Sequence, residues 1–224
     1  GRKYGVLPTM QDDVLSIMVW NFEDGMEDDV NDRKIRLTLA NVPFKGEYKL
    51  IHYRIDKEHS NSYAVWKRMG KPYSPSVEQI RHIREREGLE LYGPIENIKM
   101  NYNMSFEIDM PMHSVSLLLL VPANGNKPEV PRFIKGVVEE GYNGNPQVFL
   151  KWVPSKEKDF LYYKVWRRSE NEREYTVISD NTSLNTATYI DMDVEKGKKY
   201  YYKIQAINAS GMESELSEEL MVEI

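Results

Sequence analysis

The stretch VEKGKKYYYKIQAIN, Val194–Asn208, combines a turn signal with a long strand pattern. Its glycine lies among charged residues, which favours a tight turn, and large side chains then recur at every second position. Successive side chains of a strand point to opposite faces, so four of them share one face: Tyr200, Tyr202, Ile204 and Ala206. The stretch therefore predicts a β-strand with one side in a core.

Further strand patterns lie on both sides of this stretch, separated by turn-forming residues. With the strand at Lys199–Asn208, the predicted strands are Arg132–Glu139, Gln147–Val153, Leu161–Ser169, Tyr175–Ile178, Thr188–Ile190 and Glu218–Ile224. Short strands at this spacing are typical of a two-sheet Greek-key sandwich. The second half of the chain is therefore predicted to be such a sandwich.

Three runs in this half resemble the fibronectin type III family: FLKW at 149–152 followed by Pro154, YKV at 163–165, and the opening stretch itself. The resemblance implies that Trp152 belongs to the structural core. It also implies that Tyr200 is the family's corner tyrosine, whose hydroxyl bonds to the chain just upstream.

A domain boundary is predicted at Pro122–Pro128, PANGNKP, where an apolar strand stops and turn formers crowd together. Two domains follow, at 1–125 and 128–224. In the first, predicted strands cover Val14–Phe22, a half-exposed segment around Ile35–Leu39, Tyr48–Ile55, Ile98–Ile108 and Ser114–Val121. The predicted fold class is therefore all-β, with two β-sandwich domains in tandem.

One short helix is predicted in the first domain, at Val77–Glu87. Ser76 precedes it as N-cap with Gln79 three residues on, a pair that forms a capping box, and Gly88 suits its end. The apolar residues of this helix recur at helical spacing and are expected to face the sandwich: Val77, Ile80 and Ile83.

Composition excludes several classes of function. The net charge is −5 with Lys and Arg scattered, which argues against nucleic acid as a partner. Cysteine is absent, which excludes disulfides and thiolate sites. The longest apolar run, Val115–Val121, is too short to span a membrane. No signal peptide opens the chain, which begins with Gly1, so an excised fragment or a processed product is expected.

The run HYRIDKEHSNSYAVWKRMG, His52–Gly70, packs charges, two histidines and large aromatic residues together. It resembles the segment that follows the catalytic barrel in glycoside hydrolase family 39, which contains β-xylosidases and α-L-iduronidases. The resemblance rests on RIDKEHSNSY at 54–63 and on WKRMG at 66–70, and extends to SPSVEQ at 74–79. It implies that the first domain is the accessory sandwich of such an enzyme, without its barrel.

The resemblance suggests six residues as a candidate interface with the barrel: Arg54, Asp56, His59, Asn61, Tyr63 and Trp66. Arg54 and Asp56 would act as a charge pair, Asn61 as a backbone cap, and the two aromatic residues as apolar anchors. In the alternative interpretation, the apolar members of the run cover an open edge of the domain's own sheet: Tyr63, Val65, Trp66 and Met69.

No catalytic residue is predicted in this chain. A retaining glycosidase needs two carboxylates about 5 to 5.5 Å apart on a rigid scaffold. No acidic residue here lies in the apolar strand-end setting that would mark a general acid. In family 39 both catalytic glutamates lie on the barrel, so the chain alone is expected to be inactive.

No cofactor or metal site is predicted either. The chain has four histidines, His52, His59, His82 and His113. None of them has the spacing that would place two metal ligands on one face. The acidic segment Glu23–Asp32 could hold calcium, but its spacing is not that of the twelve-residue calcium loop, and a solvated hairpin loop is the alternative.

The chain is thus expected to be the non-catalytic C-terminal region of a family 39-like hydrolase, packed against a (β/α)8 barrel. The resemblance favours a secreted or periplasmic parent that cleaves β-xylosidic or uronosyl linkages with retention. One alternative is a protein-interaction module. Another is a carbohydrate-binding module with an aromatic platform drawn from Trp20, Tyr53, Trp66 and Tyr73.

Overall fold

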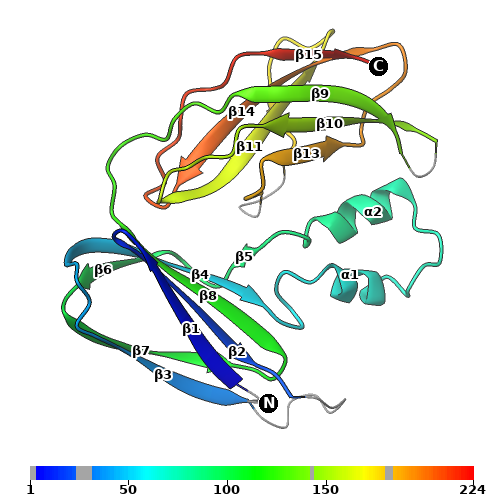
Figure 1. The fold of residues 1–224 in the computed structure, drawn as a ribbon. Coiled ribbons are helices and arrows are strands. Elements are labelled where there is room, and N and C mark those ends of the chain that lie inside the picture. Colours follow the sequence, from blue (N-terminus) through cyan, green and yellow to red (C-terminus); the bar gives the residue numbers. More distant parts are fainter. Residues whose placement is uncertain (1–3, 24–31, 142–143, 180–183) are drawn as a thin grey trace. The chain divides into compact units, whose positions relative to one another are not determined.

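The computed structural model describes residues 4–23, 32–141, 144–179 and 184–224. It divides into two compact units, a first unit of Gly1–Asn124 and a second unit of Gly125–Ile224. Both are built mostly of antiparallel strands, so the predicted all-β class is confirmed (Figure 1). Each unit is considered by itself below.

The first unit is a sandwich of two sheets. Its main sheet has the order β1-β2-β8-β4-β5, with β6 also paired to β4, and its second sheet pairs β3 with β7. The strands are β1 Tyr4–Gln11, β2 Val14–Asn21, β3 Arg33–Ala40, β4 Gly46–Ile55, β5 Glu90–Leu91, β6 Glu96–Met100, β7 Asn103–Met110 and β8 Ser114–Pro122. Side chains from both sheets form one core, which includes Ile17, Leu37, Leu50, Met110 and Leu120.

Four strands of this unit differ from prediction: β1, β6 and β7, and the two-residue β5, which no pattern in the sequence predicted. The segment predicted as a single strand at Ile98–Ile108 is β6 and β7, because the chain leaves the main sheet after Met100 and enters the second sheet at Asn103. β1 was not predicted, since its sequence YGVLPTMQ contains Gly5 and Pro8. An edge strand tolerates proline, and β1 pairs only with β2.

The connection from β4 to β5 contains two helices, α1 Ser62–Arg68 and α2 Val77–Arg84, where the sequence predicted one. α1 was missed because it has only seven residues and lies within the mixed run at 52–70. α2 has the predicted capping box between Ser76 and Gln79, but none of its residues is fully buried, and it packs beside α1. The prediction that the apolar face of α2 is buried against the sandwich is therefore wrong.

The second unit has two sheets, with orders β13-β10-β9 and β12-β11-β14-β15. The strands are β9 Phe133–Glu140, β10 Pro146–Trp152, β11 Phe160–Ser169, β12 Thr176–Val177, β13 Thr188–Asp191, β14 Lys199–Asn208 and β15 Leu220–Glu223. All seven coincide with predicted strands to within a few residues. They form the two-sheet sandwich that the spacing of the turns predicts.

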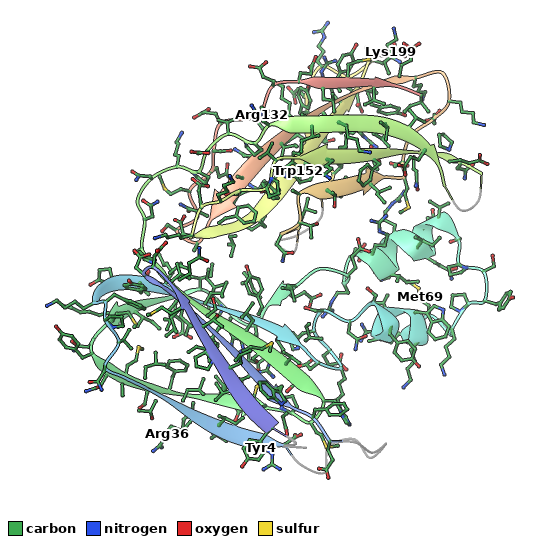
Figure 2. The ribbon with its side chains drawn as sticks, in the orientation of Figure 1. Tyr4, Arg36, Met69, Arg132, Trp152 and Lys199 are labelled. Atoms are coloured by element: carbon green, nitrogen blue, oxygen red, sulfur yellow. The ribbon has the colours of Figure 1, made fainter. Side chains whose placement is uncertain are left out.

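Trp152 and Tyr200 both lie in the core of this second unit (Figure 2 labels Trp152). The Trp152 side chain is fully buried, and its ring meets Tyr163 edge to face with centroids 5.1 Å apart. The Tyr200 hydroxyl accepts a hydrogen bond from the backbone N–H of Glu195 at 3.2 Å. This bond ties β14 to the turn before it.

Candidate functional site: a helical hairpin anchored on a buried arginine

The run at 52–70 begins on the last four residues of β4 and continues through the loop 56–61 into α1. The chain then passes through α2 and returns to the sheet at β5, which pairs with β4 through Tyr53 opposite Leu91 and Arg54 opposite Glu90. We call residues 61–89 the hairpin. Figure 1 shows its two helices outside the strands of the main sheet.

Arg54 lies under the base of the hairpin and is completely buried. Its Nε donates to Ser116 Oγ at 2.7 Å, and its Nη2 donates to the carbonyl of Asp109 at 2.7 Å. Ser116 belongs to the main sheet and Asp109 to the second sheet, so this one side chain joins the two layers. Burial lowers the pKa of the Arg54 guanidinium, an effect that Tyr92 and Asp56 oppose.

Asp56 organises the loop that follows β4. Its Oδ1 accepts hydrogen bonds from the backbone N–H groups of Glu58 and His59 and from His59 Nδ1, at 2.7, 2.8 and 2.9 Å. Its Oδ2 lies 3.6 Å from Arg54 Nη1. Burial raises the pKa of Asp56, but these hydrogen bonds outweigh burial and hold the pKa below its usual value. Asp56 is therefore held ionised, so it stabilises the loop as a hydrogen-bond acceptor and is not suited to act as a general acid.

Ser60 and Asn61 connect this loop to the strands and to α1. Ser60 Oγ donates to the carbonyl of Arg54 at 2.7 Å and accepts from the backbone N–H of Glu90 at 2.8 Å, so it bridges β4 and β5. Asn61 Nδ2 donates to the carbonyl of Asp56 at 3.0 Å, and its Oδ1 accepts from Ala64 N–H as the N-cap of α1. Asn61 is thus a backbone cap, but for the chain's own helix.

His52 and Tyr92 belong to the same cluster, although neither was proposed from the sequence as part of it. The Tyr92 ring lies 4.8 Å from the His52 ring, 5.1 Å from the His59 ring and 4.2 Å from the Arg54 guanidinium carbon. His52 Nε2 is 2.8 Å from Ser116 Oγ. Burial, followed by the charge of Arg54, lowers the pKa of His52 to about 4.

The hairpin itself exposes aromatic side chains. Tyr63 is 60% exposed, and its ring centroid lies 5.4 Å from that of Trp66. Trp66 is half-buried, and its Nε1 donates to the carbonyl of Pro72 at 3.1 Å. Val65 alone on α1 is buried. The alternative interpretation therefore fits Val65, while Tyr63 faces solvent.

A second set of contacts also holds the base of the hairpin. Arg86 donates to the carbonyl of Glu58 and forms an ion pair with Glu90, with Nη2 and Oε2 2.7 Å apart. Arg68 reaches Glu58 at 3.2 Å on the surface. The four polar residues Arg54, Asp56, His59 and Asn61 are thus engaged within the first unit, whereas Tyr63 and Trp66 lie where another surface could reach them.

Among the described residues, no group of three or more His, Cys, Asp or Glu side chains could hold a metal ion. Most of the acidic segment proposed for calcium, residues 24–31, lies outside the described residues. In the part of the chain that the structure describes, no helix is long and apolar enough to cross a membrane.

Comparisons with known proteins match the chain to parts of longer proteins. No family model matches the chain. Amylopullulanase of Thermoanaerobacterium saccharolyticum is 30% identical over 132 residues, which cover 59% of this chain and 10% of that protein. An exo-β-1,2-glucooligosaccharide sophorohydrolase of Parabacteroides distasonis is 30% identical over 95 residues, covering 42% of this chain and 13% of that protein. The chain thus spans about a tenth of the length of the curated relatives it matches.

Among solved structures, a bacterial orthologue of human α-L-iduronidase matches 98% of this chain with a TM-score of 0.75 and 22% identity. The match covers 37% of that chain. The folds of the two units therefore both occur within one part of a longer protein, and the chain resembles the accessory β-sandwich regions of glycoside hydrolases.

Proposed function

We propose that this chain is the accessory region of a family 39-like glycoside hydrolase, which packs against and supports a catalytic (β/α)8 barrel. The match of nearly the whole chain to 37% of an α-L-iduronidase orthologue carries this proposal. The motif at 52–70 supports the same family. Fold likeness alone does not determine a substrate, so β-xylosidic or uronosyl linkages are proposed for the parent by analogy.

The hairpin supplies a surface for this role. Its base is held by Arg54, Ser60 and Arg86, so the exposed pair Tyr63 and Trp66 is presented on a supported helix. Aromatic side chains with little freedom are efficient anchors because binding immobilises few additional bonds. We therefore propose Tyr63 and Trp66 as contacts with the barrel, positioned by Arg54, Asp56, His59 and Asn61.

The test is an assay of the purified chain and of its full-length parent on aryl xylosides and aryl iduronides. We expect turnover by the parent and none by the chain. Turnover by the chain that a single carboxylate substitution abolishes would overturn the accessory role. In the parent, Tyr63→Ala with Trp66→Ala should lower the thermal stability of the barrel. Tyr102→Ala, at another exposed tyrosine of the same unit, is the matched control.

The structure also bears on the carbohydrate-binding alternative. Of the four aromatic residues considered for a platform, Tyr53 is buried and Trp20 and Trp66 are half-buried. Only Tyr73 is fully exposed among them, and one ring is not a platform for several sugar units. Retention of the chain on xylan or another polysaccharide, lost in Tyr73→Ala, would nevertheless favour that function.

A further inference from the structure

The main sheet of the first unit is apolar on both faces. Its inner face, with Leu15, Ile17 and Val19 on β2, packs on the second sheet. Strand register places the residues of the outer face in three rows across β1, β2, β8 and β4. The rows are Gly5–Trp20–Val115–Ile55, Leu7–Met18–Leu117–Tyr53 and Thr9–Ser16–Leu119–Ile51. We call these twelve positions the outer patch.

The outer patch contains no charged residue, which is unusual for a surface that meets water. It is incompletely covered. Leu7 is 50% exposed, Ile55 is 44% exposed and Met18 is 39% exposed, Trp20, Val115 and Leu117 are half-buried, and Ile51 and Tyr53 on β4 are buried within the chain, so the free part of the patch lies over β1, β2, β8 and the end of β4. Strands that are apolar on both sides are typical of sheets covered on both faces. Contiguous apolar surface of this kind marks a docking site in most proteins.

We infer that the outer patch is the surface on which the catalytic barrel sits, through helices of the barrel's outer ring. This inference rests on the proposed function and specifies its contact surface. A flat uncharged sheet face fits the apolar stripe of a helix, and a (β/α)8 barrel presents helices all around its circumference. The iduronidase orthologue leaves 63% of its own length outside the match, so such fold relatives have enough chain to provide that occupant.

Gly5 contributes to the shape of the outer patch. A Cβ atom at this position would lie 2.3 Å from Cζ2 of Trp20, so the indole lies flat over the glycine. No other residue leaves room for the ring in this orientation. Gly5 therefore lets the Trp20 ring pack directly on the β1 backbone at the edge of the patch.

The experiment measures binding of the chain by isothermal calorimetry to the separately expressed barrel of its own parent protein, after circular dichroism and a cooperative thermal transition have shown that this barrel is folded. Leu7→Glu with Met18→Glu should weaken binding by about tenfold or more, because each charge would be buried without a partner. The control is Val6→Glu with Met10→Glu. Val6 and Leu7 are neighbours on β1 with exposed fractions of 49% and 50%, but Val6 and Met10 point to the other side of the sheet. The control pair should change affinity by less than about threefold.

The outcomes separate the two proposals. If the wild-type chain does not bind the barrel, the proposed function itself fails. If it binds and neither pair weakens it, or both pairs weaken it equally, the outer patch is not the contact surface and the proposed function stands. A wild-type chain that is dimeric in sedimentation and becomes monomeric with Leu7→Glu and Met18→Glu would assign the patch to a second copy instead.

Folding of the variants is checked by circular dichroism and thermal melting. The substituted side chains are exposed, so melting temperatures close to that of the wild type are expected. If the Leu7 and Met18 pair does not fold, Ile55→Gln, at the third exposed apolar position of the patch, replaces it. Unchanged barrel affinity in a folded Ile55→Gln chain would then count against the inference.

Discussion

Buried polar side chains decide most of the local structure around the hairpin. Arg54 donates hydrogen bonds to Ser116 and to the carbonyl of Asp109, and its charge is balanced by the Asp56 carboxylate at 3.6 Å and the Tyr92 ring at 4.2 Å. A buried charge is tolerated only when it is paired in this way. The sequence predicted that Arg54 contacts a neighbouring domain. Sequence spacing alone does not distinguish a partner within the domain from one outside it.

His52 should make the first unit sensitive to acid. Its pKa is about 4 in the folded chain and about 6.5 when unfolded, so between these values the unfolded state binds more protons. Stability is therefore fully present above about pH 6.5 and is lost as the pH falls towards 4. Allowing for partial exposure, we expect a loss of about 2 kcal/mol from this residue.

The measurement is urea unfolding at pH 7 and pH 4.5 for the wild type and for His52→Gln. The variant keeps a polar partner for Ser116 but does not titrate, so its loss between the two pH values should be smaller by about 2 kcal/mol. Equal losses in both proteins would show that protonation of His52 does not destabilise the fold.

Trp152 should be the most costly single truncation in the second unit. Its side chain is fully buried against Tyr163, and Trp152→Ala would leave a large cavity. We expect the free energy of unfolding to fall by about 3 to 5 kcal/mol in chemical denaturation. Tyr200→Phe, which removes only the bond to Glu195, should cost about 1 kcal/mol. A similar cost for both variants would contradict this ranking.

Helix α1 depends on its cap more than on its own sequence, because seven residues are too few for a stable isolated helix. Asn61→Ala removes the acceptor for Ala64 N–H and the donor to Asp56, and should cost about 1 to 2 kcal/mol. Asn61→Asp keeps the acceptor and should cost less. Hydrogen exchange of the amides in residues 62–68 would show this as faster exchange in the alanine variant, and unchanged exchange would refute the role of the cap.

Elements with a regular pattern could be predicted from the sequence, and elements set by tertiary contacts could not. Lys199–Asn208 and Val14–Asn21 alternate or run apolar, and the capping box of α2 lies at fixed spacing. β5 has two residues and exists because it pairs with β4, and Tyr92 joins the Arg54 cluster only through that pairing. No pattern in the sequence links Tyr92 to Arg54, 38 positions away.

At the scale of the whole molecule, the order of the strands makes the first unit dependent on its last strand. β8 lies between β2 and β4, and pairs Leu15 with Leu120 and Leu50 with Leu120. A chain ending at residue 113 should therefore not fold, whereas one ending at residue 124 should show a cooperative thermal transition. Circular dichroism melting of the two fragments checks this, and a cooperative transition of the shorter fragment would contradict it.

The bond made by Ser60 has a consequence for how this scaffold can change. Because its hydroxyl ties the carbonyl of Arg54 to the amide of Glu90, the two points where the hairpin leaves and rejoins the sheet are joined independently of the residues between them. The segment inserted between β4 and β5 could therefore be replaced by another segment without loss of the contact between the two strands. Recognition can diversify there while the architecture underneath stays the same.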